Sequence, residues 1–427
     1  MAEITYPTGV ENHGGFLRIW FIYNGSRVRE PLGVPDTPKN RKSAGELRAV
    51  VTYAIKTGTF DYLKQFPASN NLKKCGINNY GLTIGDIANN WLSIKRPELA
   101  KTTLKAYEAR MRTALYYLNG KSKIEDIKPE DILNLRNTLL SGLQLKRNPG
   151  HTPTKGRSVV TVNGILTDLA GMFRYAEENG YIRSSPMVNI SSMKKVTKKP
   201  HPITREEFPR LMAGCGTRQI RNLWALAIYT GMRHGEICAL AWEDIDLVNG
   251  TILIRRSLTT LKYFKEPKTI SGIRTINLIQ PAIDALLDQR ELTRLGKKIS
   301  IEVTTREFRK TYIEECTFVF NPKINAMNNL STDHYSVASI AQTWNTAIRR
   351  AGIVSRKAYQ SRHTYACWSL SSGANPNFIA SQMGHVNSQM VHQVYGAWMQ
   401  ENNIGQVELL NSKLASFAPS LPQLKVV

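Results

Sequence analysis

Apolar and polar positions alternate strongly over residues 15–33, GFLRIWFIYNGSRVREPLG, which predicts β-structure near the start of the chain. One face of the predicted strand is apolar and comprises Leu17, Ile19, Phe21 and Tyr23. The opposite face carries Arg18, Trp20 and Ile22. Asn24-Gly25 favours a tight hairpin turn into a second strand, which carries Arg27 and Arg29.

A helix is expected after this hairpin, because apolar residues recur at helical spacing at Ala44, Leu47, Val51, Ala54 and Ile55. We therefore expect residues 1–66 to form a small sheet-plus-helix module. Basic and aromatic side chains would line the open face of its sheet. That face is either a DNA-binding surface or an ordinary solvated face, and the pattern leaves both open.

Residues 82–188 show the periodicity of several amphipathic helices. The first helix opens with Ile84, Ile87, Ala88, Trp91 and Leu92. The second is marked by Leu104, Tyr107, Met111, Leu115 and Leu118. A third has Pro129 near its start, and the last contains Ile165, Leu166, Leu169, Phe173 and Ala176. The pattern predicts an all-α domain, preceded by a polar, turn-rich linker at 67–81.

Residues 189–204 form a lysine-rich connector bounded by prolines, and residues 205–400 have the pattern of a mixed domain. In that domain TILIRRSL and IRTINLI are predicted strands, with helices before and after them. The tail, residues 401–427, carries an apolar stripe made of Ile404, Val407, Leu410, Leu414 and Phe417. The stripe either covers the domain's own core or docks on a neighbouring copy of the chain. The predicted fold is multidomain and mainly α, with small β-sheets in the first module and in the mixed α+β domain.

The charge balance narrows the class of partner. Lys and Arg together number 57 against 33 acidic residues, a formal net charge of +24. Such an excess favours a polyanion, DNA or RNA, although a basic enzyme without a nucleic-acid role is the alternative. Candidate DNA contacts are Arg18, Trp20, Arg27 and Arg29 on the N-terminal sheet and Lys194, Lys195, Lys198 and Lys199 in the connector.

The cysteines and the N-terminal sequence indicate the cellular compartment that we expect for the protein. The five cysteines are scattered without metal-ligand spacing, so we expect no disulfide framework, no metal and no cofactor. The start, MAEITYPTGVENHGG, lacks the pattern of a signal peptide. No apolar run approaches the length that spans a bilayer. A cytoplasmic, nucleoid-associated protein without a membrane partner is expected.

Four stretches of the mixed domain carry side chains suited to phosphate chemistry. YTGMRHGEICALAWEDID puts Arg233 after a Thr-Gly turn at the start of a helix. FKEPKTISGIRTINL puts Lys268 beside a Ser-Gly turn that joins two strands. KAYQSRHTYACWSLSSG carries Arg362 in a helix, and MGHVNSQMVHQVYGAW supplies His385 and Tyr395. Each residue alone is a weak signal, since an arginine on a helix is usually a solvated charge; their order and spacing carry the prediction.

These contexts, TGMRxGE, PKTxxxxRxI, SRHTxA and MGH…Y, resemble those of the tyrosine recombinase (phage integrase) family. The resemblance covers nearly the whole chain. Residues 205–400 are similar to its catalytic domain and residues 82–188 to its helical core-binding domain. Residues 1–66 resemble the arm-type DNA-binding domain of phage integrases.

The resemblance also implies roles for single residues. Arg233 and Arg362 would be the two phosphate-binding arginines, and Glu236 would support them. Lys268 would be the general acid on a β-hairpin. His385 would lie beside the nucleophile, Tyr395.

One position departs from the family pattern. The family commonly has His-x-x-Arg-His, whereas residues 359–363 of this chain are YQSRH. Tyr359 thus replaces a histidine usually credited with hydrogen bonding to the phosphate and with proton transfer. A tyrosine can donate a hydrogen bond but does not carry a proton near neutral pH. Either Tyr359 keeps the hydrogen-bonding role alone or another group takes the proton, and His392, three residues before Tyr395, is one candidate.

The implied reaction explains these residue types. Attack by tyrosine forms a 3′-phosphotyrosyl bond and releases a 5′-hydroxyl. Two arginines can fork onto the non-bridging phosphate oxygens, and their charge is expected to favour the phenolate form of Tyr395. The covalent bond retains the phosphodiester energy, so neither ATP nor metal is expected. The sequence lacks the evident carboxylate cluster that a two-metal nuclease requires.

The sequence therefore predicts a recombinase that integrates and excises a phage or other mobile element. By resemblance its partners are double-stranded DNA with core and arm sites, other copies in a homotetramer, a directionality factor and a host DNA-bending protein. The alternatives are a recombinase that resolves chromosome dimers, an inactive relative that binds DNA as a regulator, and a type IB topoisomerase. The arm-type module argues against the first and third, and the full set of cationic residues with Tyr395 argues against the second.

Overall fold

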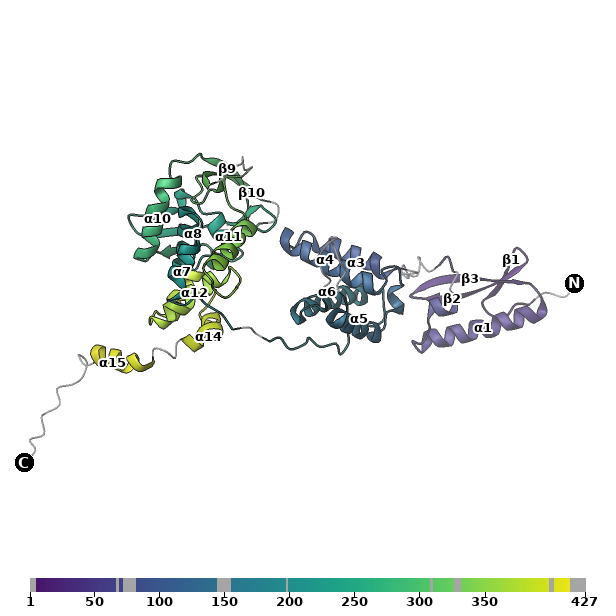
Figure 1. Ribbon diagram of the computed structural model, residues 1–427. Helices are drawn as coiled ribbons and strands as arrows, with labels where there is room; N and C mark the ends of the chain where they lie inside the picture. Colours follow the sequence, from purple (N-terminus) through teal and green to yellow (C-terminus); the bar gives the residue numbers. More distant parts are fainter. Residues whose placement is uncertain are drawn as a thin grey trace, which may run out of the picture. The chain divides into compact units, whose positions relative to one another are not determined.

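The computed structural model describes residues 5–66, 69–71, 82–143, 155–196, 199–307, 310–325, 332–398 and 403–414 (Figure 1). The chain divides into two compact units. One comprises Met1–Ile94 with Tyr107–Met193, and the other comprises Lys95–Ala106 with Lys194–Val427. Within the described ranges, every helix is too short or too polar to cross a bilayer.

The N-terminal module is an antiparallel sheet with one long helix against it (Figure 1). Its elements are β1 (Val10–His13), β2 (Phe16–Tyr23), β3 (Ser26–Pro35), α1 (Pro38–Lys56) and α2 (Tyr62–Gln65). The strand order is β1-β2-β3, and both residues of the turn between β2 and β3 have positive φ, 49° at Asn24 and 77° at Gly25. The predicted hairpin and helix are confirmed. The short strand β1 was not predicted.

The predicted alternation along β2 is also confirmed. Leu17, Ile19 and Phe21 are buried, whereas Arg18 and Trp20 are partly exposed on the other face. The buried side chains pack with Val28 of β3 and with α1 into a separate small core. The open face is therefore free of the module's own core.

Four helices confirm the predicted all-α region: α3 (Ile84–Lys95), α4 (Lys101–Tyr117), α5 (Pro129–Ser141) and α6 (Val159–Glu178). Pro129 stands at the first turn of α5, where its missing N–H costs no hydrogen bond. The buried residues of this region share one cluster, to which α6 contributes most.

The remaining helices and strands lie in roughly the second half of the chain, from Glu207 onward. The helices are α7 (Glu207–Gly214), α8 (Arg218–Thr230), α9 (His234–Cys238), α10 (Gln280–Thr293), α11 (Val337–Arg350), α12 (Gln360–Ser371), α13 (Pro376–Met383), α14 (Gln389–Tyr395) and α15 (Asn403–Leu414). The strands are β4 (Ile245–Asp246), β5 (Thr251–Ile254), β6 (Ser257–Leu258), β7 (Phe264–Lys265), β8 (Arg274–Asn277), β9 (Ile299–Thr304) and β10 (Thr311–Cys316).

These strands form two sheets, with orders β4-β5-β8 and β10-β9-β7-β6. The antiparallel pair β5–β8 confirms the two predicted strands. The expectation that only helices follow them is wrong, because β9 and β10 pair over six residues each. Their alternating burial was visible in the sequence as Ile299, Ile301 and Val303.

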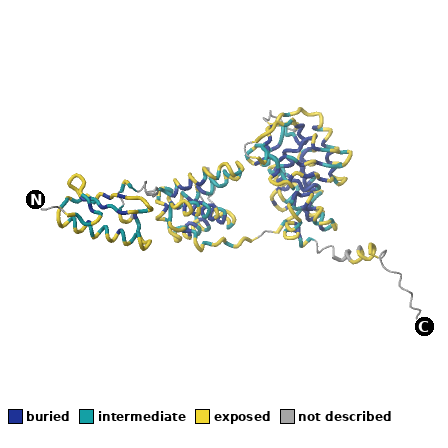
Figure 2. Tube along the Cα trace, turned by 180° about the vertical axis from the view of Figure 1, so that it is seen from behind, coloured by how far each residue is buried: buried dark blue, intermediate teal, exposed yellow. Residues whose placement is uncertain are grey.

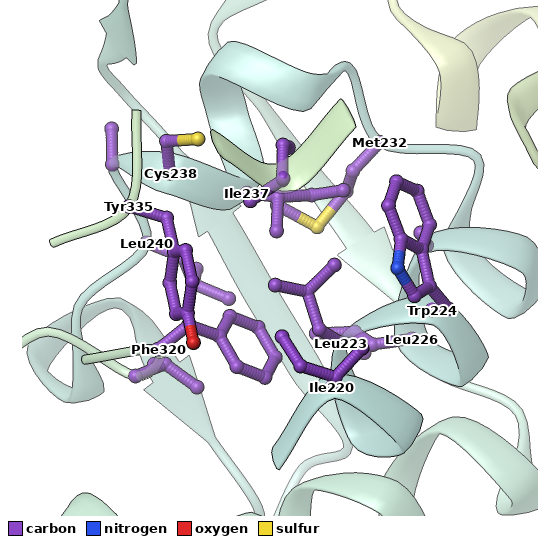
Figure 3. Packing of buried hydrophobic residues seen from close by; sticks show 14 of the residues in the cluster. Ile220, Leu223, Trp224, Leu226, Met232, Ile237, Cys238, Leu240, Phe320 and Tyr335 are labelled. Atoms are coloured by element: carbon purple, nitrogen blue, oxygen red, sulfur yellow. The ribbon is translucent and has the colours of Figure 1, made fainter. Parts of the chain in front are cut away.

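The core of this region is assembled around α8. Figure 3 shows Ile220, Leu223 and Trp224 of α8 packed with Met232 and Ile237. The ring of Trp224 also meets that of Trp344 edge-on, at 4.7 Å between centroids. A second cluster joins α12, α13 and α14 and includes Tyr395. The buried interior (Figure 2) thereby fixes the helix ends that carry the candidate residues.

The apolar stripe of the tail does not cover the chain's own core at its described positions. Val407 is 61% exposed, and Leu410 and Leu414 are each 53% exposed. For these three residues the first of the two alternatives is wrong. The side chain of Ile404 and all of Phe417 lie outside the described residues.

Candidate active site

Arg233 lies where α8 ends and α9 begins. α8 stops at Gly231, whose φ of +64° and 2.5 Å separation of an added Cβ from Cδ1 of Tyr365 both exclude a larger residue. Arg233 then caps α9, and its backbone N–H donates to Oε2 of Glu236 at 2.8 Å. Its guanidinium donates to Oε1 of the same carboxylate at 2.9 Å. The predicted turn before Arg233 and the supporting role of Glu236 thus have a direct geometric basis.

Glu236 is buried and holds a second arginine as well. Arg274 of β8 donates from both terminal nitrogens to the two carboxylate oxygens, at 3.0 and 2.9 Å. Burial by itself would raise the pKa of Glu236, but the hydrogen bonds and charge of Arg274, aided by Arg233, hold it below its ordinary value. Arg274 was not singled out from the sequence, although it is the arginine of the quoted PKTxxxxRxI pattern.

Arg362, on α12, is only 1% exposed and has neutral partners. It donates to the carbonyl oxygens of Gly231 at 2.5 Å and Met383 at 2.6 Å, and to Nε2 of His385 at 3.0 Å. Burial, followed by the charge of Arg233, lowers the pKa of Arg362 to about 10. The charge of Glu236 opposes this lowering only in part.

Three arginines therefore surround one carboxylate. Arg233, Arg274 and Arg362 supply three positive charges, and Glu236 supplies one negative charge. The two charges left over lie on guanidinium groups, which present paired N–H donors to a phosphate. The charge and the donors of the cluster are suited to bind an anion.

His385 follows Gly384, the left-handed residue that ends α13. Because its Nε2 accepts from Arg362, the neutral ring carries its hydrogen on Nδ1. Burial and the nearby arginines lower the pKa of His385 to about 4, so the ring stays neutral at physiological pH. Its Nδ1 is buried and has no hydrogen-bond partner within the described structure. The described hydrogen bond of its ring is the one with Arg362.

Gly384 is needed for both its backbone and its small size. Its φ is +66°, and an added Cβ would lie 3.0 Å from Nη1 of Arg274. Gly384→Ala should cost about 1–2 kcal/mol of unfolding free energy for the left-handed backbone and should also displace Arg274. Gly352→Ala is the matched control, because Gly352 has φ +62° but open space around a Cβ. Chemical denaturation should show a lower free energy of unfolding in both variants. Anion binding by the arginine cluster should weaken only in Gly384→Ala. Equal anion binding by the two variants would contradict this account.

Tyr395 ends α14 and is 3% exposed. Burial raises the pKa of its phenol above the ordinary value, and the charge of Arg362 only partly opposes that rise. The charge of Arg362 favours the phenolate, as expected, but the loss of solvent outweighs this one cationic neighbour and the net pKa shift is upward. The phenol needs a proton acceptor to become a nucleophile.

The hydroxyl of Tyr395 contacts a histidine that sequence reasoning did not assign. Nδ1 of His363 lies 2.6 Å from it. His363 follows Arg362 on α12 and is one helical turn after Tyr359, so it shares a face with the position where the family pattern fails. That spacing was a local signal for it.

Tyr359 itself is 42% exposed, and its described contacts are between rings. Its ring centroid lies 5.3 Å from that of His363 and 5.9 Å from that of His234. His392, the other candidate for proton transfer, is exposed on α14. The geometry thus favours His363 over both.

Lys268 lies outside the hydrogen-bonded cluster, exposed in the connection between β7 and β8. These two strands belong to different sheets, so the expected simple hairpin around Lys268 is wrong. Lys194, Lys195 and Lys199 of the connector are exposed, and Lys198 lies outside the described residues.

The N-terminal candidates gather on the open face of the sheet. The guanidinium of Arg27 lies 3.7 Å from the ring centroid of Trp20. Arg18 is paired with Glu11 at 2.8 Å, and Arg29 lies 3.6 Å from the same carboxylate. Among Arg18, Arg27 and Arg29, Arg27 is therefore the one whose described contact is aromatic rather than ionic.

Three family models match successive parts of the chain. Residues 7–70 match the arm DNA-binding domain, residues 83–140 the phage integrase N-terminal SAM-like domain, and residues 201–401 the phage integrase family. The chain is 41% identical to the prophage integrase IntR of Escherichia coli (strain K12), over 96% of this chain and 99% of the other.

The chain belongs to the phage integrase family.

It is thus a tyrosine site-specific recombinase of the integrase type. A second relative, the protein IntQ of Escherichia coli (strain K12), is 50% identical over 89% of this chain and 96% of its own length, and its name describes it as defective. Among solved structures, the integrase of transposon Tn1549 in complex with a circular intermediate DNA superposes with a TM-score of 0.58. That match covers 77% of this integrase and 99% of the other chain at 19% identity, which establishes the shared fold.

Proposed function

We propose that this chain cuts and rejoins double-stranded DNA through a 3′-phosphotyrosyl bond at Tyr395, and thereby integrates and excises a phage or other mobile element. The observation that carries the proposal is the excess of two positive charges at Arg233, Arg274 and Arg362 around the single carboxylate of Glu236. A scissile phosphate is the anion that such a cluster, next to a tyrosine, is suited to bind.

The arginines would act on the charge that develops during cleavage. Arg233 and Arg362 can each present two N–H donors to the non-bridging oxygens of the pentacoordinate phosphorus. Donors positioned in this way contribute on the order of 2.7–4 kcal/mol each in comparable oxyanion sites. The unpartnered Nδ1–H of His385 is a further donor whose protonation does not change near neutral pH.

The leaving 5′-oxygen needs a proton, and Lys268 is the proposed source. Its exposed position between two sheets is compatible with reaching into a DNA groove. Rejoining is the reverse attack by a 5′-hydroxyl on the phosphotyrosyl bond. The basic connector with Lys194, Lys195 and Lys199 would follow the phosphate backbone, as would Lys198.

The arm-type domain favours an integrase over the alternatives. The match at residues 7–70 and the 41% identity to a prophage integrase both favour a protein that binds arm as well as core sites. A chromosome-dimer resolvase or a type IB topoisomerase has no evident need for such a domain. We also propose a homotetramer on DNA, assisted by a directionality factor and a host DNA-bending protein, as the family's mechanism implies.

The test is covalent attachment to DNA without metal. Nicked duplexes tiled across the DNA that flanks the coding sequence would be incubated with the full chain and EDTA, then separated under denaturing conditions. We expect attachment to the 3′ end at one short core sequence. Tight binding without attachment would instead support the alternative of an inactive DNA-binding regulator. The relative IntQ is named as a defective protein.

The open face of the N-terminal sheet gives a second prediction. Arg27→Ala should weaken binding to arm DNA and reduce the salt dependence of log K by about one unit, since one phosphate contact is lost. Titrations of flanking-DNA fragments at several salt concentrations measure this slope. Lys56→Ala is the control, because Lys56 is an exposed cation on α1. An equal loss of DNA affinity in both variants would argue against a DNA-binding surface on the open face of the sheet.

A further inference from the structure

The hydroxyl of Tyr395 and the half-buried imidazole of His363 form a hydrogen-bonded pair with no role in the scheme above. We propose that His363 is the general base that takes the proton of Tyr395 during strand cleavage and returns it during rejoining. The proposal rests on the proposed function of Tyr395 as nucleophile. It assigns proton transfer to a residue one helical turn beyond the position where this chain carries Tyr359.

The geometry already has the form that such a step requires. Nδ1 of His363 lies 2.6 Å from the phenolic oxygen, at the short end of the roughly 2.6–3.2 Å range for a general base and its proton. The two residues come from α12 and α14, which pack through one shared apolar cluster. The imidazole also contacts two aromatic rings, with centroids 5.3 Å away at Tyr359 and 5.6 Å away at Tyr395.

The electrostatics give a reason for the pair. Burial raises the pKa of the Tyr395 phenol, so the hydroxyl does not ionise unaided near neutral pH. Burial and then the charge of Arg362 lower the pKa of His363, so its ring is neutral and able to accept a proton. When a phosphate neutralises part of the arginine charge, the imidazole becomes more basic at the moment the nucleophile is needed.

The step balances in atoms and charge. The Oη–H proton of Tyr395 moves to Nδ1 of His363 while Oη forms a bond to phosphorus. The bond from phosphorus to the 5′-oxygen breaks, and that oxygen takes a proton from Lys268. In rejoining, the 5′-hydroxyl attacks phosphorus and returns its proton to the neutral amine of Lys268. The phosphorus–Oη bond breaks, and the phenolate recovers its proton from the imidazolium.

The other histidines near Tyr395 are less suited to this step. Nε2 of His385 already accepts from Arg362, and its pKa of about 4 makes it a poor base. His392 is exposed on α14. Tyr359 meets His363 through its ring, which holds the imidazole in place without accepting a proton.

The first experiment compares His363→Asn with His392→Asn in single-turnover attachment to the nicked core duplex. Asparagine keeps a polar group at the β-carbon and can hold the tyrosine hydroxyl, but it cannot take a proton. We expect His363→Asn to slow attachment by about 10²–10⁴-fold with DNA binding unchanged, and His392→Asn to remain near the wild-type rate. Similar rates for His363→Asn and wild type would overturn the proposal.

A DNA substrate with a modified leaving group distinguishes a general base from a general acid. With sulfur in place of the bridging 5′-oxygen, the leaving thiolate needs no proton, so the defect of Lys268→Ala should be relieved. The defect of His363→Asn should persist on the same substrate, because the phenol must still lose its proton. Relief of both defects would place His363 on the leaving-group side and overturn the assignment.

The pH profile gives a readout that a purely structural role would not move. The groups facing His363 are Tyr395, Tyr359, Arg362 and His385. The neutral imidazole is the active form, and its lowered pKa keeps that form present below the ordinary value of about 6.5. At subsaturating DNA the wild-type rate should fall only below that pH, and the fall should disappear in His363→Asn.

The outcomes also separate this proposal from the proposed function. If the wild-type chain forms no adduct at all, the proposed function is wrong, and the role of His363 as general base is wrong with it. If wild type reacts and His363→Asn reacts equally well with an unchanged pH profile, only the role of His363 is lost. Circular dichroism and denaturation of each variant exclude a folding defect as the cause of a slow rate.

Discussion

Tyr395→Phe is expected to abolish covalent attachment to DNA completely while leaving DNA binding intact. The substitution removes the nucleophilic oxygen and retains the ring, which packs in the cluster of α12, α13 and α14. It also removes the hydrogen bond to His363, a loss of about 1 kcal/mol in unfolding free energy at most sites. The arginine cluster is untouched, so the phosphate should still bind.

Denaturing gels with the nicked duplex measure attachment, and titration under native conditions measures binding. Tyr53→Phe is the matched control, because Tyr53 is 72% exposed on α1 and belongs to the arm-type module. It should react as wild type does. An adduct formed by Tyr395→Phe would show that another residue is the nucleophile.

Arg362→Lys is expected to reduce the attachment rate by about 10²–10³-fold, the effect of about 2.7–4 kcal/mol of lost charge stabilisation. A lysine keeps the charge but cannot hold the carbonyl oxygens of Gly231 and Met383 while it also forks onto a phosphate. The orphaned carbonyls should also lower the unfolding free energy, by about 1–3 kcal/mol for each group left unsatisfied.

Single-turnover rates at saturating DNA test the first effect and chemical denaturation tests the second. Arg349→Lys is the matched control, since Arg349 is exposed in the last turn of α11 and the exchange there is conservative. A rate for Arg362→Lys within a few-fold of wild type would mean that charge alone, without paired donors, is enough.

The local sequence was sufficient to predict most helices and strands, because their apolar periodicity depends only on neighbouring residues. The hairpin at Asn24-Gly25 and the four helices from Ile84 to Glu178 needed only turn chemistry and apolar spacing. The pair β9–β10 was missed, because its alternation is short and rich in charge and its burial comes from one side only. The placement of Lys268 was also misjudged, since strands adjacent in sequence entered two different sheets.

The sequence by itself determined the residue types of the site and their order, from Arg233 to Tyr395, because each stands in a recognisable local context. Only the tertiary structure decided which groups meet. Arg274 reaches Glu236 across 38 residues, and His363 reaches Tyr395 across 32. Protonation states followed from the same packing, since burial raised the pKa of Tyr395 against the pull of Arg362. The desolvation of each group and its hydrogen-bond partners depend on how the helices pack. This packing cannot be read from the spacing of residues along the chain.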